Sequence, residues 1–388
     1  MAAPSVDDKL HDVVKGDDNL ISYCHELAAD IEKRSLEFVN LVEKLGFALT
    51  DEDVALRERG TLVLSYVLQN IPEDFLQENE LHFITSFFVD RLKDHHNVIP
   101  AVLKGILAIV SMKNLPEEAP SRILSTMFRE ISCQSQLQSD RRVIYRIIHT
   151  SIVNKLEEMK KMGPDLVAGV IQSIDGERDP RNLLFLFSIL PTFIGNFELG
   201  HLTEEMFDVI SCYFPVDFSP PANDPNSVTR EDLAHLLAQS LVSTTAFAEF
   251  CLPLLMEKLD SNIRVAKLDA LLVLREACKK FLLKDLEPHI RELWKCILKE
   301  IIPGTEKEIQ DAAIATLKEL IYKLSVEITN KEQSKLLPDL LTQVIGASQS
   351  LLTEVDSSLF VAVIKLLTAS AEASPFACHY IVSRVQKP

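Results

Sequence analysis

Glycine, tryptophan and positive charge are all scarce in this chain. Its 388 residues include 11 glycines and one tryptophan, and 40 basic residues stand against 57 acidic ones, a net charge of −17. Glycine is needed where φ is positive or where a backbone approaches a phosphate, so its scarcity disfavours Rossmann, P-loop and β-sandwich folds. An acidic chain repels polyanions on average, so direct binding of nucleic acid is not expected.

Long apolar runs and paired cysteines are also missing. No run of about 18 consecutive apolar residues occurs, so the sequence predicts no membrane span. The first 20 residues are acidic and lack the features of a secretory signal or a mitochondrial presequence. The seven cysteines are scattered, and most lie among aliphatic residues, where a reduced thiol behaves as a small hydrophobe. We therefore expect a reducing compartment, the cytosol or the nucleus.

No motif of a known catalytic site occurs. The sequence has no GxSxG, GxxxxGK[ST], GxGxxG or HExxH pattern. His95 and His96 are adjacent, and neighbours on a helix point about 100° apart, so they are poorly placed to share one metal ion. The sequence predicts no catalytic residue, no cofactor or metal site, and no enzymatic activity.

Two charged segments allow a chemical and a structural interpretation. Residues 175–181 (DGERDPR) hold three carboxylates and two guanidiniums, which could do acid–base work. A solvated turn between helices with local ion pairs is the favoured interpretation. Residues 152–161 read as one exposed helix in which Glu157 pairs with Lys161 at i,i+4.

The hydrophobic pattern is helical almost throughout. Apolar residues make up 47% of the chain and recur at i, i+3, i+4 and i+7 in segments separated by short polar turns. The clearest unit, residues 250–281, consists of one helix, a turn at 260–262 and a second helix. No sustained alternation of apolar and polar residues indicates a strand. The sequence predicts an all-α fold.

This two-helix unit recurs along the chain. The mean spacing of the first apolar residue of each second helix is (359 − 56)/7, or about 43 residues, close to that of HEAT repeats. These anchors are Leu56, Val98, Val143, Leu183, Leu233, Ile263, Ile309 and Leu359. Since one helix pair cannot bury its apolar face alone, stacked pairs share a continuous core. We therefore expect a HEAT-repeat α-solenoid, a superhelical stack of antiparallel helix pairs with an elongated form.

The pattern divides the chain into four parts. Residues 1–34 are expected to form an acidic amino-terminal helical cap, followed by HEAT-like repeats over 35–213 and 229–388. Between them, residues 214–228 form a predicted proline-rich loop, because proline removes backbone donors and restricts the residue before it. Thirteen acidic residues stand against five basic ones in residues 1–53, so this end either solubilises the array or binds a partner.

Several segments do not follow from a generic HEAT pattern. They are RLKDHH at 91–96 with NVIP at 97–100, GERDPRNLL at 176–184, SCYFPVDFSPPANDP at 211–225 and FAEFCLPLLMEKLDS at 247–261. Together they resemble the amino-terminal region of the methyl-methanesulfonate-sensitivity protein nineteen family. The resemblance is clearest over residues 35–325.

The resemblance implies a scaffold of the cytosolic iron–sulfur assembly targeting complex. It implies as partners a WD-repeat propeller, a small adaptor, and iron–sulfur apoproteins such as DNA helicases and polymerases. It also implies a location in cytoplasm and nucleus, with a spindle association. Family members are longer, so we expect this chain to be a fragment, a truncated product or a short isoform with weakened binding of propeller and adaptor.

The family-like segments supply candidate interaction residues. They are Arg91, Lys93, Asp94, His95, Arg178, Asp179, Arg181, Tyr213, Asp217 and Asp224. The expected function is a non-enzymatic scaffold whose concave face binds partners, with no cofactor of its own. An adaptor of the nuclear-transport or phosphatase type is the alternative, although the Trp-Asn arrays of importins are missing: Trp294 is followed by Lys295.

Overall fold

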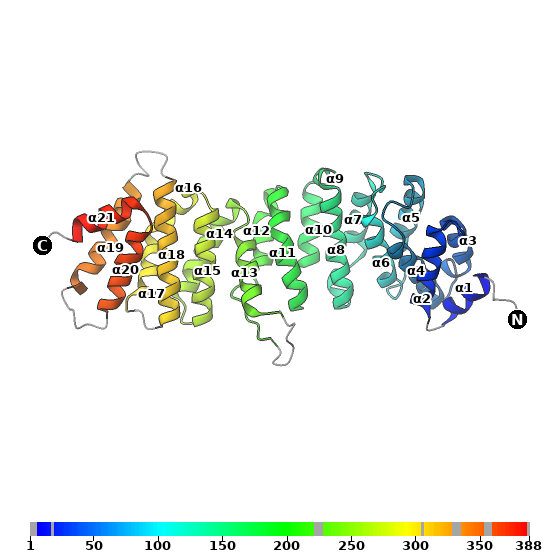
Figure 1. Ribbon diagram of the computed structural model, residues 1–388, viewed down its shortest axis with the longest axis horizontal. Coiled ribbons are helices and arrows are strands. Elements are labelled where there is room, and N and C mark those ends of the chain that lie inside the picture. Colours follow the sequence, from blue (N-terminus) through cyan, green and yellow to red (C-terminus); the bar gives the residue numbers. More distant parts are fainter. Residues whose placement is uncertain are drawn as a thin grey trace. The chain divides into compact units, whose positions relative to one another are not determined.

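The computed structural model is helical wherever it describes the chain. It describes residues 6–16, 19–220, 228–303, 306–327, 335–352 and 359–385, and these contain α-helices, short 3-10 helices and no strand (Figure 1). None of the helices in these ranges is both long and apolar enough to cross a membrane. The prediction of an all-α, HEAT-like fold is confirmed.

The chain divides into two compact units, residues 1–182 and 183–388. Helices of the first unit are α1 (Val6–Lys15), α2 (Leu20–Glu32), α3 (Phe38–Leu49), α4 (Val54–Asn70), α5 (Glu78–Arg91), α6 (Ile99–Ser111), α7 (Ala119–Glu130), α8 (Gln138–Asn154), α9 (Leu156–Lys161) and α10 (Pro164–Ile174). Helix α11 (Pro180–Asn196) begins in the first unit and ends in the second. Helices of the second unit are α12 (Thr203–Ser211), α13 (Arg230–Leu241), α14 (Ala248–Asp260), α15 (Arg264–Lys280), α16 (Leu283–Leu286), α17 (Ile290–Ile301), α18 (Lys307–Val326), α19 (Leu336–Leu352), α20 (Phe360–Glu372) and α21 (Pro375–Val385).

Antiparallel pairs stack within each unit. In the first, α3 packs on α4 and α5 on α6; the second helices α4, α6 and α8 lie side by side, as do the first helices α5, α7 and α10 (Figure 1). In the second, α14 pairs with α15 and α17 with α18, and α13, α15, α18 and α20 follow one another. Each unit therefore has two helical layers with its core between them.

Apolar stripes and local caps explain why these segments are helices. The buried residues of α18 include Ile309, Ala313, Leu317 and Leu320, which share one face of a helix. At the start of α13, the Thr229 hydroxyl accepts a hydrogen bond from the Asp232 backbone N–H at 3.0 Å and so caps the helix. This cap fixes where α13 begins.

The repeat anchors all lie where a second helix begins. Each is found within the first two turns of a helix or directly before it: α4, α6, α8, α11, α13, α15, α18 and α20. The spacing of apolar residues thus predicted the repeat correctly.

The helix expected over residues 152–161 is interrupted. Helix α8 ends at Asn154 and α9 begins at Leu156, because Lys155 leaves the helical region at φ −138° and ψ 47°. The predicted pair of Glu157 with Lys161 is wrong. Lys160 instead pairs with Glu157, and Lys161 with Glu158, each at i,i+3.

Helix α6 approaches its neighbours closely at Gly105. A Cβ atom there would lie 2.1 Å from Cε1 of Phe88 on α5 and 2.7 Å from Oγ of Ser65 on α4. The Ser65 hydroxyl donates to the Ala101 carbonyl of α6 at 2.8 Å. Glycine therefore lets three helices of neighbouring repeats meet at one point.

Candidate functional site

Two of the predicted interaction residues bind each other at the end of α5. Asp94 accepts hydrogen bonds from Arg91 at 2.7 Å and from Arg57 of α4 at 2.8 and 3.1 Å. Burial alone would raise the pKa of Asp94, but hydrogen bonds from Arg57, the His95 backbone and Arg91 hold that pKa well below its usual range. Arg91 and Asp94 thus join the turn after α5 to α4.

Lys93 and His95 lie beside this cluster and are exposed. The imidazoles of His95 and His96 lie 4.1 Å apart between ring centroids. No group of three or more His, Cys, Asp or Glu side chains in the described ranges is arranged to hold a metal ion. An interaction role for Lys93 and His95 stays a prediction.

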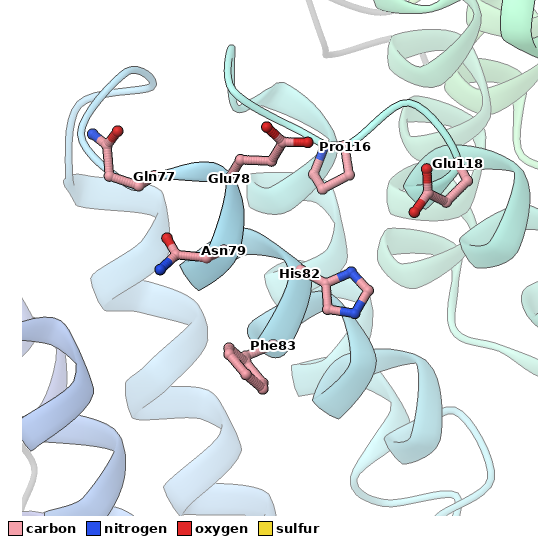
Figure 2. Close-up of a pocket in the computed structure, with 7 residues that line it drawn as sticks. All are labelled: Gln77, Glu78, Asn79, His82, Phe83, Pro116 and Glu118. Atoms are coloured by element: carbon pink, nitrogen blue, oxygen red, sulfur yellow. The ribbon is translucent and has the colours of Figure 1, made fainter.

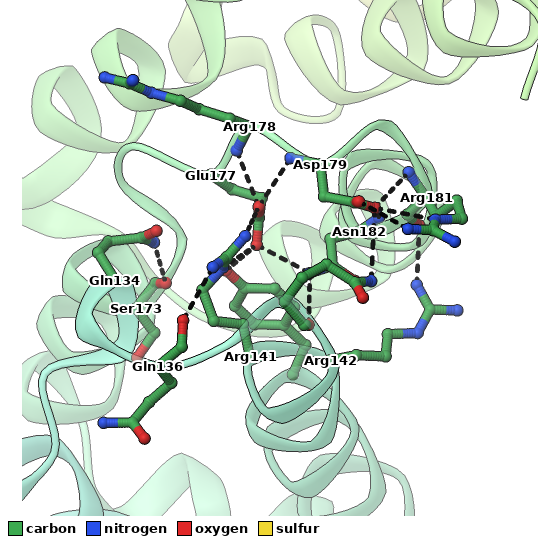
Figure 3. A network of polar contacts seen from close by, with 12 residues as sticks. Gln134, Gln136, Arg141, Arg142, Ser173, Glu177, Arg178, Asp179, Arg181 and Asn182 are labelled. Atoms are coloured by element: carbon green, nitrogen blue, oxygen red, sulfur yellow. Dashed lines mark hydrogen bonds and ion pairs between the residues drawn. The ribbon is translucent and has the colours of Figure 1, made fainter. Parts of the chain in front are cut away.

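The segment 175–181 contains the most buried charge of the first unit. Glu177 is 1% exposed, and its carboxylate accepts hydrogen bonds from Arg141 of α8 at 2.7 and 2.8 Å and from the Tyr145 hydroxyl at 2.8 Å (Figure 3). The Asn182 amide donates at 3.0 Å. Although burial raises the pKa of Glu177, these bonds, led by Arg141, lower it to about 2. The sequence favoured a solvated turn, but the structure buries Glu177 at the centre of this one.

Around Glu177, the predicted residues have different roles. Asp179 accepts hydrogen bonds from the Arg181 and Asn182 backbone N–H groups at 3.0 and 3.2 Å, which caps α11, and it also pairs with the Arg181 side chain. Arg178 is exposed and donates its backbone N–H to Glu177. Figure 3 shows the Arg178 side chain pointing away from the buried carboxylate. An interaction role for Arg178 stays a prediction.

A third carboxylate, Asp269 of α15, holds the start of the proline-rich segment in the second unit. It accepts a hydrogen bond from the Val216 backbone N–H at 2.9 Å and two from Arg230 of α13 at 2.7 and 2.8 Å. Phe214 and Val216 are buried, so the segment begins against the core.

The remaining predicted residues belong to this region. The Tyr213 ring packs edge-on against Phe187 with centroids 5.6 Å apart, and Asp217 is exposed. Residues 214–220 contain no helix, and Asp224 lies outside the described residues. The loop over 214–228 and the role of these residues in binding stay predictions.

The arginines that hold these carboxylates were missed as a group. Each of four pairs joins residues about one repeat apart: Arg57–Asp94, Arg141–Glu177, Arg230–Asp269 and Arg264–Glu306. A search for opposite charges separated by one repeat could have found them, since stacked repeats bring such positions together. These pairs join neighbouring repeats, and one of them engages Asp94, which the family-like motifs indicated as a candidate for binding a partner.

The buried thiols are not suited to act as nucleophiles or metal ligands, because both roles need the thiolate. Burial raises the pKa of Cys24, Cys251 and Cys278 to about 12, so they stay protonated near neutral pH. Cys212 and Cys378 are exposed and lie far apart in the sequence. Metal or cluster ligation would require clustered thiolates instead.

The surface around α5 offers hollows for a partner. One lies between α5 and α3 and is lined by Phe38, Phe83 and Phe87. A second lies between the start of α5 and the segment before α7, where Figure 2 shows His82 and Phe83 of α5 on one side and Pro116 and Glu118 on the other. A third, lined by Phe87 and the predicted residues Arg91, Lys93 and Asp94, adjoins the Asp94 cluster. Aromatic side chains of α5 thus connect neighbouring hollows.

Residues 42–303 match the model of the MMS19 amino-terminal family, described as Dos2-interacting transcription regulator of RNA-Pol-II. The chain belongs to this family. The resemblance inferred from the sequence motifs is thereby confirmed.

Family relatives align with nearly the whole chain. The MMS19 nucleotide excision repair protein of Drosophila melanogaster is 38% identical over 398 residues, which cover 97% of this chain and 42% of that protein. The homologue of that name in Homo sapiens is 38% identical over 377 residues, which cover 97% of this chain and 36% of that protein. The homologue in Bos taurus is 39% identical over 361 residues, which cover 93% of this chain and 35% of that protein. The chain therefore spans well under half the length of these family members.

The alignment with a solved structure of an engineered protein covers 98% of this chain and 92% of the engineered chain. Its sequence identity is 15% and its TM-score 0.44, a likeness too distant to inform fold or function.

Proposed function

We propose that this chain is a non-enzymatic scaffold of cytosolic iron–sulfur protein assembly, which helps target cluster insertion to apoproteins of DNA replication, repair and genome maintenance. The observation that carries the proposal is the 38% identity to a nucleotide excision repair protein over 97% of the chain. The iron–sulfur cluster is the cargo of this machinery and is not a resident group of the scaffold.

The distribution of polar groups supports a binding role. Charges between repeats, such as Glu177 and Asp269, are held by arginines of the same unit, so these carboxylates are engaged in ion pairs that join repeats. The exposed hollows around α5 are lined by aromatic and acidic side chains, which are suited to contact with another protein.

The proposed partners are of two kinds. Iron–sulfur apoproteins such as DNA helicases and polymerases are the clients that this chain contacts. The WD-repeat propeller and the small adaptor would bind mainly to repeats that the relatives have outside the aligned part. Activity in cytoplasm and nucleus, with a spindle association, is part of the same proposal.

Affinity purification of the tagged chain from cells tests the proposal. We expect iron–sulfur-dependent helicases or polymerases to be enriched, and the propeller and adaptor to be depleted relative to a purification with a full-length relative. Recovery of nuclear-transport receptors or phosphatase subunits without any iron–sulfur protein would contradict it and favour the adaptor alternative. The single tryptophan already disfavours that alternative, because Trp294 is 3% exposed and cannot form a surface array.

A further inference from the structure

Helix α5 carries an aromatic side chain that its own repeat does not bury. Phe83 is 75% exposed, whereas Phe88 on another side of the helix is fully buried. Phe87 lies one turn after Phe83 and is partly exposed, and Val39 of α3 is exposed as well. Leaving so large an apolar side chain in water forgoes the free energy that its burial contributes. Such exposure calls for an explanation outside the fold of the unit.

Phe83 and Phe87 line a groove between α3 and α5, which we call the α5 groove. Its apolar lining consists of Phe38, Val39, Val42, Phe83, Ile84 and Phe87, and its volume is about 310 Å³. The lining residues lie at helical spacing on each helix, so each helix presents one apolar stripe to the groove. A space of this size and chemistry accepts one or two large apolar side chains.

The next first helices along the chain lack a comparable feature, although α21 (Pro375–Val385), at the far end of the described residues, exposes Phe376, Val382 and Val385. Within the described residues, α7, α10, α12, α14 and α17 carry no exposed large hydrophobic side chain. On these helices, the faces that meet solvent carry no large apolar side chain. The apolar surface of α3 and α5 is therefore a local departure and not a general property of the repeat.

The rim of the α5 groove is acidic. Glu43 and Glu80 line the groove itself, and Glu78 and Glu118 line the adjoining hollow, which also includes Phe83 (Figure 2). No lysine or arginine lines either space. In the described part of the chain, Glu43, Glu78 and Glu118 take part in no ion pair. Their charges remain available to a ligand.

We propose that the α5 groove binds a segment of a partner protein that carries a large apolar side chain flanked by lysine or arginine. The apolar side chain would enter the groove against Phe83, and the cationic groups would lie over the acidic rim. Aromatic rings here already accept a cation, because the Arg91 guanidinium lies over the Phe87 ring at 5.2 Å.

The charge of the rim argues against other occupants. Nucleic acid and anionic membrane are repelled by the carboxylates that line the groove and the hollow that Phe83 also lines. A second copy of this chain is itself acidic, with a net charge of −17. The proposal deepens the scaffold function and rests on it only in taking the ligand to be a protein.

The test measures fluorescence anisotropy of labelled peptides titrated with the full 388-residue chain. The probe is a helical peptide of about 18 residues with leucine and phenylalanine on one face and lysine on the other. Matched peptides replace lysine by glutamate, or the apolar face by serine. We expect only the lysine peptide to bind saturably, and its affinity should fall as the salt concentration is raised. No saturable binding, or equal binding of the glutamate peptide, overturns the proposal.

Variants locate the binding site. Phe83→Ser should weaken binding about tenfold, and the double change Glu43→Gln and Glu78→Gln should weaken it and flatten its salt dependence. Leu137→Ser is the matched control, because Leu137 is 72% exposed in the same unit but lies away from the groove residues in the sequence. Equal affinity of Phe83→Ser and the unaltered chain overturns the proposal.

Phe83→Trp gives a second readout that does not depend on loss of binding. Because Trp294 is buried, a tryptophan at position 83 adds an exposed indole, whose emission should shift to the blue when the lysine peptide docks. An unchanged emission at saturating peptide contradicts docking at this groove. Far-ultraviolet circular dichroism confirms that each variant is folded.

The cellular experiment separates this proposal from the scaffold function. If the unaltered chain enriches iron–sulfur proteins and Phe83→Ser enriches them equally, the α5 groove is not their docking site, while the scaffold function stands. If neither enriches them but the peptide results hold, the groove stands and the proposed function fails.

Discussion

At the scale of single residues, Glu177 shows how much a buried charge depends on its neighbours. Arg141 donates to it through two nitrogen atoms, and the Tyr145 hydroxyl, the Asn182 amide and the backbone N–H groups of the two following residues donate as well. Removing one partner of such a pair leaves the other charge buried and unpaired, which is far more costly than the loss of a surface ion pair. The turn that the sequence marked as a partner contact therefore also ties the segment before α11 to α8.

We expect Glu177→Gln to lower the free energy of unfolding of the first unit by about 3 kcal/mol. The pH dependence is the sharper test. The folded pKa of Glu177 is about 2, below its ordinary value of 4.5, so its contribution is complete above about pH 4.5 and is lost as pH falls toward 2. Since glutamine does not titrate, the variant should lose less stability than the unaltered chain across that range.

Urea unfolding followed by circular dichroism at several pH values measures this difference. Glu157→Gln is the control, because Glu157 is 81% exposed in its pair with Lys160 and should change stability by less than about 1 kcal/mol. Parallel stability curves for Glu177→Gln and the unaltered chain would show that the buried pair is not linked to pH.

At the scale of helices, apolar spacing carried most of the information. The anchors from Leu56 to Leu359 located the second helices because stacking requires an apolar face on each of them. The break at Lys155 was missed, since nothing in the local sequence signals a change of backbone direction there. The acidic partners of Arg57 and Arg141 were missed because a local pattern does not report on residues 36 or 37 positions away.

The close approach of α6 to its neighbours leads to a prediction at this scale. Gly105→Ala places a methyl group against the fully buried ring of Phe88, so we expect a loss of stability of about 1–3 kcal/mol. Gly46→Ala on α3 is the matched control, because a Cβ atom there meets nothing within 4 Å. It should stabilise the chain by about 0.5–1 kcal/mol through helix propensity alone.

Chemical denaturation of both glycine variants measures the difference. A Gly105→Ala protein as stable as Gly46→Ala would mean that α5 and α6 separate easily.

At the scale of the whole molecule, the repeat itself predicts hydrodynamic behaviour. Because each repeat contacts only its neighbours, the sequence predicts an extended particle. A compact globule of 388 residues would have a radius of gyration of about 21 Å, and we expect small-angle X-ray scattering to give a clearly larger value. A value near that of the globule would contradict the solenoid prediction.

The interaction surfaces were harder to predict than the fold. Family-like motifs indicated Arg91 and Asp94, yet the structure turns these two side chains toward each other. Phe83 was not singled out, because an aromatic residue in an amphipathic pattern reads as core until burial shows otherwise. Fold follows from periodicity along the chain, whereas an exposed site depends on which positions the stacking leaves uncovered.

Asp269 has a consequence for how this chain tolerates change. It binds the Val216 backbone near the start of the proline-rich segment and the Arg230 side chain just after its end, so one carboxylate ties both positions to α15. Doubling the length of a loop whose ends are already fixed costs only about 0.6 kcal/mol. Since the sequence predicts a loop over residues 214–228, we expect insertions between Asp217 and Thr229 to leave the helices on both sides in place, which makes this position suited to carrying an affinity tag or a reporter domain.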